Sequence, residues 1–183
     1  MKSLRFTLPV VLLSLSLVAF AQHDEPPSAA PKSDADKTFD QLKTLAGTWE
    51  GVVKTFPQQP GMDGKLMNIS FRVTSMGHTL MHEMSGTGRP DDPITMFVVD
   101  GDRLLLTHYC AVGNQPRMVA SLSADGKSVI FDFLDATNLV APHTGHMNRV
   151  IFSSVDANHH TEEWRFLQDG KEIVEMFDLR RKG

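Results

Sequence analysis

The densest group of chemically capable side chains lies within residues 108–117, which combine an imidazole, a phenol, a thiol, an amide and a guanidinium group. Such groups hydrogen-bond ligands or transfer protons. Along an alternating strand, His108 and Cys110 share one face, whereas Tyr109 points to the opposite one. The turn that follows could donate hydrogen bonds to a ligand carboxylate or carbonyl. We therefore predict a ligand-binding set that comprises His108, Tyr109, Cys110, Asn114 and Arg117.

Two residue pairs offer an enzymatic alternative. Cys110 and His108 would lie about 6–7 Å apart on one strand face, but a cysteine nucleophile also needs a third residue to orient its base. Glu163 and Arg165 could serve in acid–base work, although a solvated ion pair is the simpler interpretation. For the first pair, the simpler interpretation is a satisfied buried histidine beside a small apolar cysteine. The sequence identifies no catalytic residue, and binding is favoured over catalysis.

The remaining histidines do not follow the spacing of a metal site. His78 and His82 would share a strand face at a separation of about 13 Å, which is too far for one metal ion. The others fall in or beside predicted loops, whereas zinc needs three or four converging ligands. Neither a Gly-x-Ser-x-Gly elbow nor a glycine-rich phosphate loop is present. We therefore predict no metal and no cofactor.

The first residues have the pattern of a secretory signal peptide. Lys2 and Arg5 precede a mainly apolar run over residues 6–20, and Ala19-Phe20-Ala21 supplies a cleavage site before Gln22. We therefore predict a signal peptide over residues 1–21 and export to the periplasm or the extracellular space. The only cysteine is Cys110, so no internal disulfide can form and a lipid anchor at the cleavage point is not expected.

Charge and composition narrow the class of partner. Hydrophobic residues make up 41% of the 183-residue chain and charged residues 22%, which are globular values. Loss of Lys2 and Arg5 with the signal would take the formal net charge from −4 to −6. An acidic chain is a poor partner for nucleic acid or an anionic membrane surface. We therefore expect a small hydrophobic ligand, no nucleic acid, and no membrane association after signal cleavage.

The organisation changes twice after the signal. Residues 22–36 contain three prolines and no large apolar side chain, which predicts a disordered spacer. Phe39, Leu42 and Leu45 then recur at helical spacing, so we expect a short amphipathic helix over residues 37–46, with Asp34 or Asp36 as N-cap and Gly47 as its end. Residues 37–183 are predicted to form one domain.

From Thr48 onward, apolar residues recur at every second position. Turn signals such as Asp125-Gly126 and Asp169-Gly170 separate the apolar runs, and no second long helix intervenes. This pattern is typical of a β-sandwich or a β-barrel. The predicted strands are Thr48–Lys54, Met67–Ser75, Thr79–Ser85, Ile94–Asp100, Arg103–Cys110, Arg117–Ser123, Ser128–Ala136, His146–Ser154, His160–Leu167 and Glu172–Arg180.

One stretch resembles a known group of barrels. Residues 42–51 run from the predicted helix into Gly47-Thr48-Trp49 at the start of the first strand, which resembles the Gly-x-Trp opening of the calycins, the lipocalin and fatty-acid-binding barrels. The resemblance implies an all-β, antiparallel up-and-down β-barrel of about ten strands with a short N-terminal helix. It also implies barrel closure by Trp49 beneath a basic residue near the end of the last strand, either Arg180 or Arg181.

The resemblance extends to secreted bacterial lipocalin-like proteins of unknown function and to the nitrobindin-like branch, whose barrels bind haem through a histidine near the C-terminus. Residues 175–183 contain no histidine, so haem binding is the disfavoured alternative. The ten methionines would suit an adaptable apolar cavity, but ordinary core filling is slightly favoured because they are scattered along the chain. The preferred hypothesis is a small-molecule carrier, and a module with a filled core is the third alternative beside an enzyme.

Overall fold

The computed structural model describes residues 31–86, 92–141 and 144–183, and all structural statements refer to these residues. The predicted signal peptide and the spacer up to residue 30 lie outside them. Within these three ranges, no helix has both the length and the apolar character needed to cross a membrane. The strands and the helix described below belong to one unit, Lys32–Gly183.

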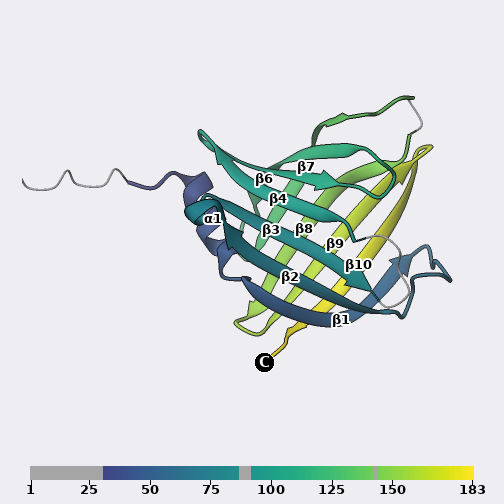
Figure 1. Ribbon diagram of the computed structural model, residues 1–183, viewed down its shortest axis with the longest axis horizontal. Coiled ribbons are helices and arrows are strands. Elements are labelled where there is room, and N and C mark those ends of the chain that lie inside the picture. The colour runs from purple at the N-terminus through teal and green to yellow at the C-terminus, as the bar shows by residue number, and fades with distance from the viewer. Residues whose placement is uncertain (1–30, 87–91, 142–143) are drawn as a thin grey trace, which may run out of the picture. The chain divides into compact units, whose positions relative to one another are not determined.

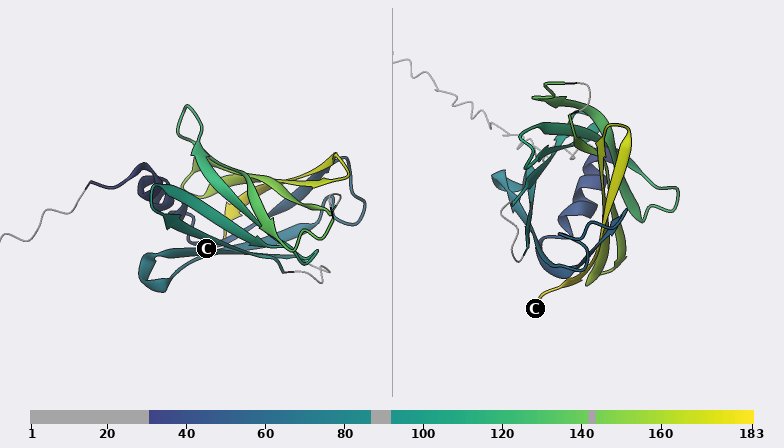
Figure 2. Two further views of the ribbon diagram at one scale, coloured as in Figure 1. Left: turned by 90° about the horizontal axis from the view of Figure 1, so that it is seen from above. Right: turned by 90° about the vertical axis from the view of Figure 1, so that its right-hand side faces the viewer.

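Ten antiparallel strands close into one barrel, with each strand paired to its neighbours in the sequence and β1 paired to β10 (Figures 1 and 2). The prediction of an all-β up-and-down barrel is confirmed. The predicted strand bounds differ from the observed ones by at most two residues at each end. The strands are β1 Gly47–Phe56, β2 Leu66–Thr74, β3 Thr79–Gly86, β4 Ile94–Asp100, β5 Arg103–Tyr109, β6 Gln115–Leu122, β7 Ser128–Thr137, β8 His146–Asp156, β9 His159–Gln168 and β10 Lys171–Arg181, and the short 3-10 turn η1 Ser75–Gly77 joins β2 to β3.

The helix α1 spans Asp34–Lys43 and lies across one end of the barrel, as the right panel of Figure 2 shows. It begins three residues before the predicted start, because Ser33 is its N-cap and forms a capping box with Asp36. Gly47 does not end it: the C-cap is Thr44, and Gly47 opens β1 with a φ of 132°. The helix therefore takes in residues 34–36 of the predicted spacer.

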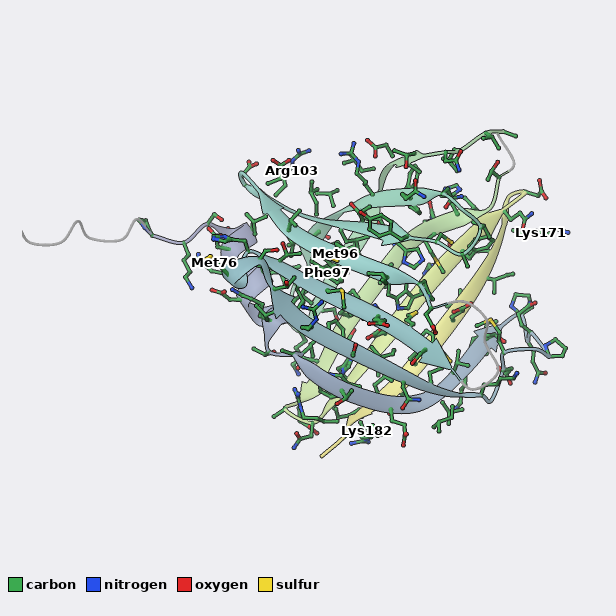
Figure 3. All side chains as sticks on the ribbon, viewed as in Figure 1. Met76, Met96, Phe97, Arg103, Lys171 and Lys182 are labelled. Carbon is green, nitrogen blue, oxygen red and sulfur yellow. The ribbon has the colours of Figure 1, made fainter. Side chains whose placement is uncertain are left out.

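The alternating turns give the barrel two distinct ends. The helix end carries α1 and the turns after β2, β4, β6 and β8, and Gln41 of α1 donates a hydrogen bond to the carbonyl of Gly126 there. The far end carries the other connections. Figure 3 labels Met76 beside α1 and Lys171 at the far end. In the helix half, Phe97, Phe131 and Phe152 meet with ring centroids 5.5–6.1 Å apart, so this half is filled by aromatic side chains.

Trp49 closes the helix end. Its ring is fully buried, and its Nε1–H donates to the carbonyl of Leu45, which fixes the link between α1 and β1. The guanidinium carbon of Arg181 lies 4.1 Å from the centre of this ring. Arg181 also donates to the carbonyls of Ala46 and Thr44 at 2.7 and 3.0 Å. Of the two arginines left open by the sequence, the structure thus places Arg181 over the indole.

We expect Arg181→Ala to destabilise the barrel by about 2 kcal/mol, because it removes a cation–π contact and charged hydrogen bonds. For a domain of this size, the melting temperature should fall by roughly 4–8 °C. Arg180→Ala is the matched control, since that side chain is 65% exposed and faces Asp178 at 3.9 Å. Thermal unfolding followed by circular dichroism measures both variants, and equal melting temperatures would contradict the closure role of Arg181.

Candidate ligand site inside the barrel

The inner wall of the far half is rich in methionine. Met67, Met84 and Met118 are buried on β2, β3 and β6, and Met147 is half-buried on β8. The sequence left open whether the methionines form a lining or merely fill gaps. Strand alternation and burial gather four of them on one inner surface, where a flexible, polarizable thioether adapts to a ligand's outline.

A second part of the wall is apolar and only half-buried. Met147 pairs with Phe166, and Phe166 pairs with Ile173, so these side chains form one row across β8, β9 and β10. The row faces inward, because Trp164 and Phe177 on the same strand faces are buried. All three members nevertheless keep partial exposure. Inward-facing apolar side chains that retain solvent contact indicate that the far half of the interior is reachable from outside.

A layer of polar side chains, the polar belt, crosses the interior between the two halves. Its first wall is a direct cross-strand row on β3, β4 and β5. Its second wall comes from alternate positions of β9. All six residues are buried: His82, Thr95, His108, His160, Glu162 and Trp164.

Glu162 is the centre of the belt. Its Oε2 accepts from His82 Nε2 at 3.1 Å and from Trp164 Nε1 at 2.9 Å, and its Oε1 accepts from His160 Nε2 at 3.0 Å. Burial alone would raise the pKa of this carboxyl, but the facing charge of His82 and the hydrogen bonds from both histidines outweigh it and lower the pKa to about 2. Glu162 is therefore ionised and already saturated by donors.

His108 is the part of the belt that borders the far half. Its Nδ1 forms a 2.8 Å hydrogen bond with Thr95 Oγ1, and its ring lies 5.1 Å from that of Trp164. Burial, followed by the charge of His82, lowers the pKa of His108 to about 3. His108 is thus an uncharged imidazole at neutral pH, able to exchange hydrogen bonds but not to supply a positive charge.

Three buried polar atoms in the described residues have no hydrogen-bond partner: Nδ1 of His82, Nδ1 of His160 and Oδ1 of Asn114. Asn114 lies next to the far half, because it alternates with the buried Pro116 and Met118 on β6. Its Nδ2 donates to the carbonyl of Gly145 at 2.8 Å. Glycine at position 145 leaves room for the ring of Phe166, since a Cβ there would lie 2.4 Å from that ring and would displace it. Asn114 and Phe166 are thereby held together at one part of the wall.

The structure separates the five residues of the predicted ligand-binding set. His108 and Asn114 are buried inside, and Cys110 is half-buried just beyond β5. Tyr109 is 51% exposed on the outer wall, as alternation requires. Arg117 is also on the outer wall, where it forms an ion pair with Asp135. Of the predicted set, His108 and Asn114 therefore face the interior whereas Tyr109 and Arg117 do not, because neighbouring positions alternate between the two faces of the strands.

The second enzymatic pair lies outside the barrel. Arg165 forms ion pairs with Glu163 on its own strand and with Glu172 on β10. Both glutamates are partly exposed, which agrees with the simpler interpretation of a solvated strand face. Among the residues that the structure describes, no three His, Cys, Asp or Glu side chains are arranged to hold a metal ion.

Sequence reasoning missed the polar belt. His160, Glu162 and Trp164 alternate along one strand, so a shared face could have been predicted. The apolar residues on the same face of neighbouring strands could have shown that this face is internal. The hydrogen bond between Glu162 and His82 could not be predicted from the sequence, because the two residues are 80 positions apart.

The buried, neutral His108 predicts acid sensitivity. Its pKa is about 3 in the fold against 6.5 for the free side chain, so the unfolded chain binds the extra proton between these values. The contribution is constant above about pH 6.5 and is lost progressively as the pH falls toward 3. By pH 5 the loss is about 2 kcal/mol.

The test is the free energy of unfolding by urea at about pH 7 and pH 5. We expect the drop between these conditions to shrink by about 2 kcal/mol in His108→Gln but to persist in His78→Gln, because His78 is exposed. An undiminished drop in His108→Gln would show that this ring does not carry the acid sensitivity.

Comparison with known proteins supports the fold alone. No protein-family model and no curated sequence matches the chain. A protein of unknown function from the DUF3598 family of Nostoc punctiforme matches 78% of this chain at 13% identity with a TM-score of 0.53, and the chain spans about half (49%) of that protein. Rv2717c from M. tuberculosis matches 82% of this chain and 99% of its own at 16% identity, with a TM-score of 0.50. The chain is similar to both as a β-barrel, and the closed ten-stranded architecture is consistent with a calycin-like fold.

Proposed function

We propose that this protein is an exported binding protein that holds a small apolar molecule in the far half of its barrel. The observation that carries the proposal is the inward-facing row of Met147, Phe166 and Ile173, which is apolar but keeps contact with solvent. Apolar side chains that face inward but remain partly exposed gain free energy when a ligand covers their exposed surface, at about 25 cal/mol per Å².

The two halves of the interior support a binding site at the far end. In the helix half, α1, Trp49 and the phenylalanine cluster occupy the interior. The polar belt then forms a floor that is fully buried. Above this floor the wall contains the methionines and the half-buried row, with Glu175 beside Ile173 on β10, so a ligand that enters from the far end would meet apolar surface on several strands. A carrier needs this combination of an adaptable wall and a few fixed polar groups.

Export is part of the proposal and rests on the sequence. The charged start, the apolar run and the small-residue cleavage site of residues 1–21 are the features on which it depends. Cell fractionation of the source organism, with the N-terminus of the protein read by mass spectrometry, tests it: a chain that begins at Gln22 outside the cytoplasm supports export. An intact Met1 in the cytoplasm would contradict it.

The binding site is tested with the chain from Gln22 onward and Nile red, an uncharged dye that fluoresces in apolar surroundings. We expect saturable binding that weakens at least about tenfold in Ile173→Asp, because the new carboxylate would have to be desolvated inside the barrel. Val174→Asp is the matched control, since Val174 faces outward opposite Phe56. Equal affinities for the two variants would place the dye elsewhere and contradict the proposed site.

Native mass spectrometry of the protein purified from its own host complements the dye. A small molecule that leaves on collisional activation, and that is absent from Ile173→Asp but present in Val174→Asp, would identify the class of ligand directly. Repeated preparations that contain no small molecule, together with no binding of the dye, would overturn the carrier proposal.

A further inference from the structure

We infer that the ligand of the far half is an apolar molecule with a hydroxyl-like hydrogen-bond donor, rather than a fatty carboxylate. This inference rests on the proposed function and names the ligand class of that same site. It follows from three features of the described residues: the direction in which the basic side chains point, the position of the interior carboxylates, and the unpartnered buried oxygen of Asn114 next to the far half.

The basic side chains of the strands are turned away from the interior. Arg117 pairs with Asp135, Arg149 with Asp132 and Arg165 with Glu163, all on the outer wall. The exception is Arg181, which follows the inner face but is committed to Trp49 and two carbonyls at the helix end.

The far rim does hold lysines. Lys171 is exposed and points away from the barrel in Figure 3, and Lys65 lies in the loop before β2. A solvated rim lysine contributes little to an ion pair. Between the rim and the polar belt, the described strands therefore offer no cation that could compensate a carboxylate, and an uncompensated buried carboxylate is costly.

The interior charges are carboxylates rather than cations, because Glu175 shares the inward face of β10 with Ile173 and Phe177 and is paired with the buried Trp164. Glu162 accepts from His82, His160 and Trp164, so its carboxylate has no need of a ligand cation. His108, the residue of the polar belt that borders the far half, is uncharged because burial strongly disfavours its imidazolium form. A ligand anion would therefore find no fixed positive counter-charge at the floor of the site and would face the carboxylate of Glu175 on the wall.

The side chain of Asn114 indicates which polar group of a ligand could form a hydrogen bond in the far half. The carbonyl of Gly145 can only accept, so the amide nitrogen of Asn114 must face it and the orientation of the amide is determined. Its Oδ1 is consequently an acceptor, fully buried and without a partner in the described residues. A ligand hydroxyl or N–H would satisfy this oxygen, whereas an ether or a carboxylate would not.

The test measures displacement of Nile red from the protein by three ten-carbon probes: decanol, decanoate and nonyl methyl ether, at about pH 8 where the acid is ionised. We expect decanol to bind at least about tenfold more tightly than each of the others, which corresponds to at least about 1.4 kcal/mol. Comparable or tighter binding of decanoate would overturn the exclusion of an anionic ligand. Equal binding of the ether would overturn the donor requirement.

A designed reversal of preference keeps this test independent of folding defects. Ile173→Lys adds a cation to the inner wall and should raise decanoate affinity at least about tenfold relative to decanol, whereas Val174→Lys adds the same charge outside and should change neither. An unchanged ratio in Ile173→Lys contradicts the inference. If Nile red binds but the probes rank differently, only the ligand class fails. If neither the dye nor any probe binds, the proposed function fails with it.

Discussion

The buried carboxylate of Glu162 is the constraint on which the interior depends. An ionised group with no solvent contact is tolerated only when donors surround it, and here they come from opposite walls: His82 from β3, with His160 and Trp164 from β9. Removal of one partner from such a buried pair costs about 3–5 kcal/mol, so the geometry between β3 and β9 is strongly specified. The belt therefore joins strands that are not neighbours in the sheet and resists collapse or widening of the barrel at that level.

This cross-link divides the interior into halves with different roles. The helix half is closed by local elements, because α1 and the Trp49–Arg181 contact come from the two ends of the domain and meet over the same core. The contacts of the helix half therefore contribute much of the free energy that stabilises the barrel. The far half does not have to be fully packed for the barrel to be stable, and its inward side chains Phe166 and Ile173 are only half-buried. A barrel that filled both halves would gain apolar burial but would lose the partly exposed inner surface on which the proposed binding site depends.

The sequence predicted the fold well because the signals for strands are local. Period-two alternation and Gly-containing turns located all ten strands, and Ile94–Asp100 was correct at both ends. The helix start was wrong because Asp34 and Asp36 competed with Ser33 as caps, and only the capping box distinguishes them. The site was predicted only in part. His108 and Asn114 do face inward, but Tyr109 and Arg117 were included through proximity in the chain, whereas strand faces alternate residue by residue. Contacts such as Glu162 with His82 depend on barrel closure, which no local pattern reveals.

The alternation of inward-facing and outward-facing residues along each strand also determines which charged side chains lie inside the barrel and which lie outside. Along β9 the inward series His160, Glu162 and Trp164 interleaves with Glu163 and Arg165 on the outside, so one strand carries both the internal network and a solvated ion pair. Outer charges keep the acidic protein soluble without entering the interior. Because every inward position is separated from an outward one by a single residue, the electrostatic character of the far half depends on very few side chains. The fold alone therefore does not identify the ligand.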